Sequence, residues 1–129
     1  MNGKELIAQA SAVRQRAYAP YSQYKVGAAL LGKSGKVYLG CNVENASYSL
    51  TCCAERTAVF KAVSEGETEF TAIAIVTENG GSPCGPCRQV LSEFAPNLTV
   101  YISSSNRAIR RTTIRKLLPD AFGPDHLSK

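Results

Sequence analysis

The sequence contains no apolar run that approaches the roughly 18 residues needed to cross a membrane. Its opening stretch, MNGKELIAQA, places Glu5 where a signal peptide would need an uninterrupted apolar segment. No internal repeat, low-complexity tract or long linker interrupts the chain. We therefore expect a single domain over residues 1–129, located in the cytoplasm and not at a membrane.

Histidine is also scarce, since His126 in the tail is the only one, and we expect it to be solvated. Cysteine, by contrast, occurs five times in 129 residues. An odd number fits poorly with a closed set of disulfides, and a cytoplasmic protein keeps its thiols reduced. Closely spaced cysteines therefore point to a metal site or to catalysis.

The formal net charge of +5 raises the question of a nucleic-acid partner, because much of it comes from residues 106–118, NRAIRRTTIRKLL. Sites that bind nucleic acid usually interleave aromatic side chains for base stacking, and this segment has none. We therefore expect a solvated face or a subunit contact, and no nucleic-acid partner, at its basic residues, Arg107, Arg110, Arg111, Arg115 and Lys116.

The spacing of apolar residues predicts helices and strands along the whole chain. A first helix is expected over residues 2–18, and Pro20 blocks its continuation. The stretch VGAALLGKSGKVYLG predicts two short strands around a polar turn. Two continuous apolar runs, FTAIAIVT and LTVYIS, are typical of strands that are covered on both faces.

Two further helices are expected between these strands. One has Thr51 as a candidate N-cap and stops near Gly66, and the other has Ser82 and Pro83 as N-cap and first residue. Strands that alternate with helices indicate the α/β class. We predict a three-layer αβα sandwich with a mixed, mostly parallel sheet of about five strands.

Each of these two helices is expected to begin in a segment that contains a cysteine pair, TCCAERTAVF or SPCGPCRQVL. Cys84 and Cys87 are three positions apart, so their sulfurs share one face of the first helical turn. Cys53 is expected in the first turn of the earlier helix. Helix N-termini stabilise negative charge and favour the thiolate form that binds metal. Two neighbouring helix starts can thus gather three thiolates around one zinc ion.

Three protein ligands leave the fourth tetrahedral position open, which is the arrangement of a catalytic zinc. Glu55 follows Cys53 by two residues and would lie close to that position, where a carboxylate can move protons. Arg56 is placed to offset the negative charge of the thiolates, and a surface arginine is the alternative interpretation.

Other interpretations of the cysteines stay open. A Cys-x-x-Cys pair alone also occurs in redox pairs and structural zinc knuckles. A structural site would need a fourth ligand, for which Cys52 is a candidate, although adjacent cysteines rarely both reach one ion. Cys41 fits a small buried side chain at a strand end. Cys-x-Glu combined with Pro-Cys-x-x-Cys is much more specific than either half.

The segments CAE at 53–55 and PCGPC at 83–87 resemble the zinc-dependent cytidine deaminases. The similarity extends through YAPYSQYKVGAAL, GCNVENASYSLTCCAER and LLPDAFGPDHL, and is greatest to the small homotetrameric form with three cysteine ligands. It implies one zinc ion per subunit, bound by Cys53, Cys84 and Cys87, with Glu55 as proton shuttle. The implied reaction is hydrolysis of cytidine, and of 2′-deoxycytidine, to the uridine nucleoside and ammonia in pyrimidine salvage.

The resemblance also implies how a nucleoside is held. Asn42 and Glu44 match positions that hold the ribose 3′-hydroxyl. The Ala54 amide would hold the base carbonyl, and the Ser82 carbonyl would accept from the amino group. Tyr24 occupies a position, usually phenylalanine, that packs on the pyrimidine.

Tyr48 and Phe122 match aromatic residues that reach the pocket of a neighbouring subunit, which implies a homotetramer.

Three alternative functions remain. A nucleoside-antibiotic deaminase of the blasticidin type would lack the NVE ribose contact. A deaminase acting on RNA or DNA fits poorly with a pocket that holds a free ribose. A structural zinc module could bind nucleic acid through the arginine-rich segment.

Overall fold

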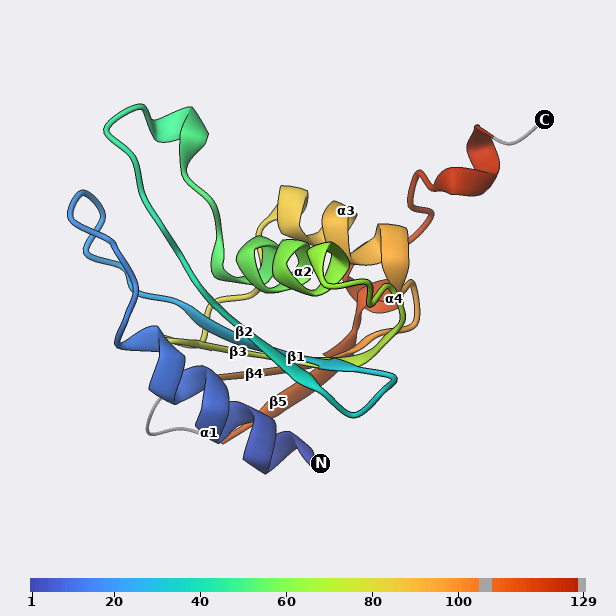
Figure 1. Cartoon of the computed structure of the whole chain (residues 1–129), viewed down its shortest axis with the longest axis horizontal. Coiled ribbons are helices and arrows are strands. Elements are labelled where there is room, and N and C mark those ends of the chain that lie inside the picture. Colours follow the sequence, from blue (N-terminus) through green and yellow to red (C-terminus); the bar gives the residue numbers. More distant parts are fainter. Residues whose placement is uncertain (105–107, 128–129) are drawn as a thin grey trace.

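The computed structural model describes residues 1–104 and 108–127, which form a five-stranded sheet with helices on both faces (Figure 1). The strands lie in the order β2-β1-β3-β4-β5. Their bounds are Gly27–Gly32 for β1, Val37–Cys41 for β2, Phe70–Thr77 for β3, Thr99–Ser104 for β4 and Arg110–Thr113 for β5. The predicted αβα sandwich of about five strands is confirmed.

Helix α1 (Gly3–Arg14) covers one face of the sheet, and α2 (Ala54–Ser64) and α3 (Gly85–Phe94) cover the other, with α4 beside them (Figure 1). The short elements are α4 (Ile114–Leu117) and two 3-10 helices, η1 (Tyr48–Leu50) and η2 (Pro124–His126). No helix in the described ranges is both long and apolar enough to cross a membrane.

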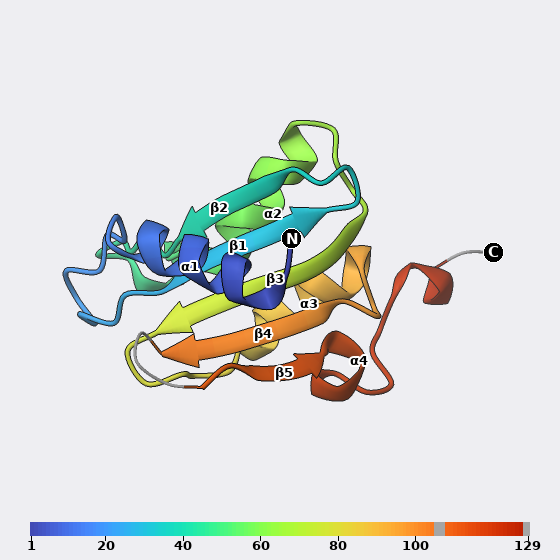
Figure 2. The ribbon, with the colours of Figure 1, turned by 90° about the horizontal axis from the view of Figure 1, so that it is seen from below.

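The sheet is mixed, but the prediction that it is mostly parallel is wrong. Among the described strands, β3 and β4 form the one parallel pair, and the other neighbours are antiparallel (Figure 2). The expected strand–helix–strand units exist, since α2 joins β2 to β3 and α3 joins β3 to β4. However, β1 is joined to β2 by a tight turn and lies between β2 and β3, running against both. The alternation of strands and helices along the chain does not show that β1 is inserted between β2 and β3.

Strand β3 forms the centre of two separate cores. Successive side chains of a strand point to opposite faces. Ile73 and Ile75 belong to the core under α2 and α3, whereas Ala74 and Val76 belong to the core under α1. Both faces of β3 are therefore covered, as its apolar run predicts.

The predicted N-caps of α2 and α3 are wrong by two residues each. Helix α2 begins at Ala54 with Cys53 as its N-cap, and α3 begins at Gly85 with Cys84 as its N-cap. Neither cysteine side chain caps its helix by a hydrogen bond. The thiols are therefore left available at the two helix starts, where the unpaired backbone amides favour negative charge.

A glycine in β2 lets the start of α2 approach the sheet closely. A Cβ atom added to Gly40 would lie 2.4 Å from the carbonyl oxygen of Ala54 and 2.6 Å from the amide nitrogen of Ala58. Both are backbone atoms that cannot move aside without shifting the helix. Gly40 thus sets the position of the first turn of α2, which carries Glu55.

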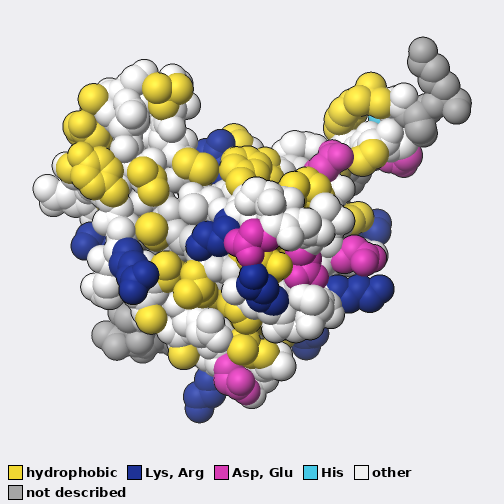
Figure 3. Space-filling model, in the orientation of Figure 1, with side chains coloured by type: hydrophobic (Ala, Val, Ile, Leu, Met, Phe, Trp, Pro, Cys, Tyr) yellow, Lys and Arg dark blue, Asp and Glu magenta, His cyan; other side chains and the backbone are white. Residues whose placement is uncertain are grey.

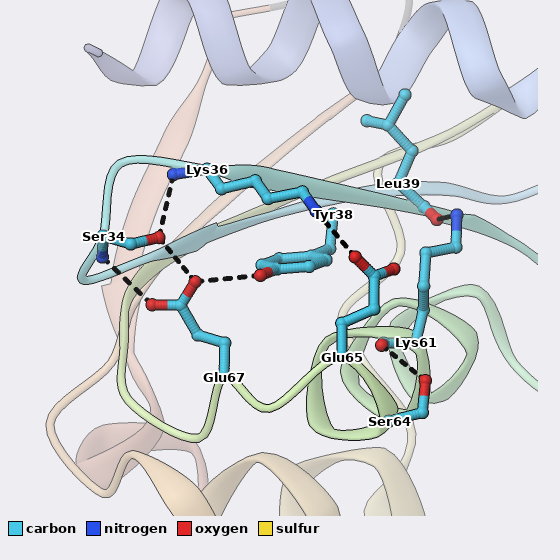
Figure 4. Close-up of polar contacts among 8 residues, drawn as sticks. All are labelled: Ser34, Lys36, Tyr38, Leu39, Lys61, Ser64, Glu65 and Glu67. Carbon is cyan, nitrogen blue, oxygen red and sulfur yellow. Dashed lines mark hydrogen bonds and ion pairs between the residues drawn. The ribbon is translucent and has the colours of Figure 1, made fainter.

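At the other end of α2, a polar network joins the β1–β2 turn to the segment that follows the helix (Figure 4). The Glu67 carboxylate accepts from the Ser34 hydroxyl at 2.6 Å and from the Tyr38 hydroxyl at 2.9 Å. Lys36 lies 2.6 Å from the Glu65 carboxylate. These contacts hold α2 at the end opposite to its cysteine, so the helix is anchored at both ends.

Candidate active site

Three cysteine sulfurs meet where the starts of α2 and α3 lie together. The Sγ atoms of Cys53, Cys84 and Cys87 all lie within 4.8 Å of one another. The Cys53–Cys84 separation is 3.9 Å and the Cys84–Cys87 separation is 3.2 Å. A tetrahedral zinc with Zn–S bonds of about 2.3 Å places its sulfurs about 3.8 Å apart. The cluster therefore fits zinc, as its sequence spacing predicts.

The environment of the cluster favours negative charge on the Cys53 sulfur. Hydrogen bonding, first from Cys87 and then from Arg56, lowers the pKa of the Cys53 thiol to about 5. The pKa of Cys87 is raised, first by its hydrogen bond to Cys53 and then by burial. The Cys87 thiol therefore stays protonated and donates this proton to the Cys53 sulfur. A metal cation that replaces the shared proton stabilises both sulfurs as thiolates.

Arg56 lies against the cluster, where the sequence interpretation places it. Its Nη2 atom donates to Cys53 Sγ at 3.3 Å and to the Thr51 carbonyl at 3.4 Å. The hydrogen bond to Cys53 is the main reason that the pKa of Arg56 is raised. The guanidinium therefore stays charged beside a sulfur, and its role in charge compensation remains a prediction.

Glu55 is a buried carboxyl group in the first turn of α2, with 4% of its surface exposed. Burial raises the pKa of Glu55 to about 7. A carboxyl group with a pKa near neutrality can both accept and release a proton during a reaction. Such a perturbed group in a cavity is typical of a catalytic site.

Glu55, Cys53 and Cys84 border a cavity of about 240 Å³, somewhat smaller than the roughly 300 Å³ at which ligand pockets usually begin. Its walls come from the segment before β1, the segment after β2, the start of α2 and the segment between β3 and α3. Seven predicted site residues line it: Tyr24, Asn42, Glu44, Cys53, Glu55, Ser82 and Cys84. The family resemblance, together with the cysteine spacing, therefore pointed to much of this lining in segments that are far apart along the chain.

Asn42 and Glu44 both face the cavity, while Val43 between them is exposed, as expected of an extended segment. Asn42 Oδ1 accepts from the Val26 amide at 2.9 Å, and its Nδ2 donates to the Tyr24 carbonyl at 2.8 Å. Asn42 therefore supports the cavity wall that carries Tyr24. This supporting role of Asn42 could not be predicted from the sequence.

The Glu44 carboxylate braces the same wall further along. It accepts from the amides of Tyr21 at 2.9 Å and Ser22 at 3.1 Å, and also from the Ser22 hydroxyl. These bonds, led by the one from the Ser22 hydroxyl, lower the pKa of Glu44. Ser22 itself lines the cavity and was missed. The turn composition around Pro20 and Ser22 is the signal that could have drawn attention to it.

The family model for the cytidine and deoxycytidylate deaminase zinc-binding region matches residues 1–103 of this chain. The match spans both cysteine segments and Glu55.

The chain belongs to the cytidine and deoxycytidylate deaminase family.

Known members of this deaminase family are similar over nearly the whole chain. A cytidine deaminase of Sporosarcina psychrophila is 50% identical over 131 aligned residues, which cover 99% of this chain and 96% of the relative. The crystal structure of cytidine deaminase from Burkholderia pseudomallei has 51% identity and a TM-score of 0.91, and covers 95% of this chain and 100% of that one. The crystal structure of cytidine deaminase from Mycobacterium tuberculosis has 40% identity and a TM-score of 0.84, and covers 95% of this chain and 98% of that one.

These similarities confirm the family resemblance and, with the cysteine cluster, the zinc cofactor. Three-cysteine deaminases need no fourth protein ligand, and Cys52 lies outside the cluster. The Cys52 sulfur instead accepts from the Thr57 hydroxyl at 3.5 Å. Cys41 is half-buried at the end of β2. The interpretation of a structural site with Cys52 as fourth ligand is thus unsupported.

Tyr48 and Phe122 do not line the cavity of their own chain. Tyr48 is 75% exposed and its ring lies 6.0 Å from that of Tyr21. Phe122 is 57% exposed and stacks on His126 at 5.3 Å. Their expected place in the pocket of a neighbouring deaminase subunit stays a prediction.

The remaining predicted residues have simple surroundings. The Ala54 side chain is buried and its amide is in the first turn of α2. His126 is largely exposed and accepts from the Gly123 amide at 3.0 Å. In the arginine-rich segment, Arg107 lies outside the described residues, and the exposed basic residues within them are Arg110, Arg111, Arg115 and Lys116.

Proposed function

We propose that this chain, as one domain over residues 1–129, deaminates cytidine and 2′-deoxycytidine by hydrolysis, releasing ammonia. The observation that carries the proposal is the meeting of a three-thiol cluster and a buried carboxyl group at one small cavity. Zinc-dependent deamination of a nucleobase needs these two elements together. A free nucleoside as substrate assigns the protein to pyrimidine salvage in the cytoplasm.

Cys53, Cys84 and Cys87 would hold one zinc ion per chain, since their sulfurs have the separations that zinc requires. Bound there, the ion supplies Lewis acidity that makes water nucleophilic at neutral pH. Arg56 offsets the negative charge of the thiolates through its contact with Cys53. This keeps three thiolates from donating so much charge that the Lewis acidity is lost.

Glu55 moves the protons of the reaction. It accepts a proton from the attacking water and passes it to N3 of the base while the water oxygen bonds to C4. It then takes the remaining proton from the new C4 hydroxyl and delivers it to the amino nitrogen. The C4–N bond breaks as the C4=O bond forms, and ammonia leaves. The raised pKa of Glu55, about 7, suits a group that must accept and donate in turn.

Other groups position the base. The Ala54 amide, at the start of α2, donates to the base carbonyl, and the Ser82 carbonyl accepts from the amino group. Tyr24 supplies the surface on which the pyrimidine packs, and its ring already borders the cavity.

The ribose is held by Asn42 and Glu44. The Glu44 carboxylate accepts three hydrogen bonds from the segment around Ser22, which leaves about one of its four acceptor positions for a hydroxyl. Its lowered pKa keeps it ionised, and a carboxylate accepts strongly from a hydroxyl.

Wild type should therefore prefer cytidine to 3′-deoxycytidine by roughly tenfold or more in kcat/KM. Glu44→Ala should bring that ratio close to one, because the acceptor for the 3′-hydroxyl is gone. Glu44 also braces the cavity wall, so Ser22→Ala is the matched control. It removes the bond from the Ser22 hydroxyl to Glu44 and the bond from the Tyr24 amide to that hydroxyl. Both losses affect the two substrates alike, so the ratio should be kept. A ratio that survives in Glu44→Ala would reject the ribose assignment.

The working unit is a homotetramer in which aromatic side chains complete neighbouring pockets. Exposed apolar residues gather on the part around η1 and on the C-terminal segment, both of which project from the molecule (Figure 3). Exposed apolar side chains that gather on projecting parts in this way are typical of an interface. They include Tyr18, Tyr21, Val43, Tyr48, Leu50, Phe122 and Leu127.

Complementation between two impaired variants tests this sharing. Phe122→Ala and Glu55→Gln should each be impaired alone. Co-expressed, they should regain activity in about a quarter of the pockets, those that combine Glu55 of one chain with Phe122 of another. Light scattering on the same samples should give the mass of four chains. An active monomer, or a mixture no better than its components, would contradict the proposal.

A further inference from the structure

Two walls of the cavity come from segments far apart in the sequence. Tyr24 belongs to the wall before β1, whereas Thr77, Gly81 and Ser82 belong to the wall between β3 and α3. The Tyr24 hydroxyl joins them, because it donates to Asn79 Oδ1 at 2.7 Å. This bond links residues that are 55 positions apart.

The acceptor of this bond is tied to the backbone next to Ser82. Asn79 Oδ1 also lies 3.4 Å from the Thr77 hydroxyl, and that hydroxyl accepts from the Gly81 amide at 2.9 Å. Gly81 is so close to the tyrosine that an added Cβ would lie 2.7 Å from the Tyr24 oxygen. The hydroxyl therefore lies between Asn79 and the backbone of Gly81.

The tyrosine is also held at its backbone. Its carbonyl accepts from Asn42 Nδ2 at 2.8 Å, and its amide donates to the Ser22 hydroxyl at 3.0 Å. With the hydroxyl bound to Asn79, the ring is fixed at both ends. The ring borders the cavity, and the loop it is tied to leads through Ser82 to Cys84.

We propose that the Tyr24–Asn79 hydrogen bond preorganises the substrate pocket by locking its two walls together before a nucleoside enters. Asn79 is then a positioning residue that acts through Tyr24 and through the loop of residues 78–82. The inference rests on the proposed function for the identity of the substrate. The bond itself does not depend on what enters the cavity.

A bond that holds the pocket throughout binding and reaction contributes equally to both, so its loss should weaken substrate and transition state about equally. Such a loss raises KM and changes kcat less. A neutral hydrogen bond of ordinary net strength corresponds to a rise in KM of about two- to tenfold. Tyr24→Phe removes the hydroxyl and keeps the ring, so packing on the base is retained.

The test uses the zinc-loaded enzyme and four variants, Tyr24→Phe, Asn79→Ala, the double variant, and Asn79→Asp, which keeps an oxygen acceptor. Both single variants should raise KM for cytidine to a similar extent, and the double variant should add little, because the two residues share one bond. Asn79→Asp should lie closer to wild type than Asn79→Ala. Hydrogen exchange in residues 78–82, measured without nucleoside, should be faster in Tyr24→Phe, since the Gly81 amide loses the support of its loop.

Tyr24→Phe with wild-type KM and wild-type exchange would overturn the inference. So would a double variant whose effect equals the product of the single effects, because the residues would then act independently. If the wild type failed to deaminate cytidine while Tyr24→Phe still accelerated exchange, the locking of the walls would be supported and the deaminase assignment rejected. The two failures are therefore distinguishable.

Discussion

Glu55→Gln is expected to fold, retain zinc and bind cytidine, yet to lose turnover by at least about 10²- to 10⁴-fold. Glutamine has nearly the same shape as glutamate, so it fits the same site, where 4% of the glutamate surface is exposed. An amide cannot accept and return a proton, and proton transfer to N3 and to the amino nitrogen is the task assigned to Glu55. Steady-state kinetics, with zinc content and nucleoside affinity measured on the same sample, check this result.

Glu65→Gln is the matched control for that experiment. Glu65 caps the far end of the same helix and pairs with Lys36 on the surface. Glu65→Gln makes the same chemical change on the same helix but leaves the cavity untouched, so its kcat should equal that of wild type. Turnover by Glu55→Gln within roughly tenfold of wild type would remove Glu55 from the mechanism.

Cys84→Ala is expected to lose zinc and to lower the midpoint of thermal unfolding markedly. Cys84 is the N-cap of α3, and its sulfur lies 3.9 Å from that of Cys53 at the start of α2. A metal at this point joins two helices, so its binding free energy also stabilises the fold. Elemental analysis after dialysis should find less than roughly a tenth of an equivalent of zinc per chain.

Cys52→Ala provides the comparison, because Cys52 neighbours a proposed ligand but lies outside the cluster. It should keep one zinc ion and unfold close to the wild-type temperature. Stoichiometric zinc in Cys84→Ala, or loss of zinc in Cys52→Ala, would show that the ligand set is wrong.

Part of the cysteine cluster could be predicted because its cause is local. The spacing of Cys84 and Cys87, and the expectation that both cysteine segments begin helices, indicated that three sulfurs can meet. The family resemblance supplied the full ligand set. The same local reasoning placed the N-caps too early, at Thr51 and Ser82. That reasoning favoured Thr51 and Ser82 because threonine and serine are common capping residues. The observed N-caps are Cys53 and Cys84, whose thiols make no capping bond and stay available for metal.

Features that depend on pairing between distant segments could not be predicted. The insertion of β1 between β2 and β3 makes the sheet mostly antiparallel. The pattern of apolar residues within one strand does not indicate which strand pairs with it. The bond between Tyr24 and Asn79 likewise joins two loops, and only the folded sheet brings these loops together. The turn-like composition around Asn79 predicts a loop there and says nothing about its partner.

Cytidine turnover and zinc content, determined on one sample of the wild-type protein, test most directly whether the cavity is a zinc-dependent deaminase site. One zinc ion per chain is expected, together with uridine and ammonia in equal amounts from cytidine. A strong chelator should abolish the activity, and added zinc should restore it. A folded protein with stoichiometric zinc and no turnover of cytidine would contradict the proposed function.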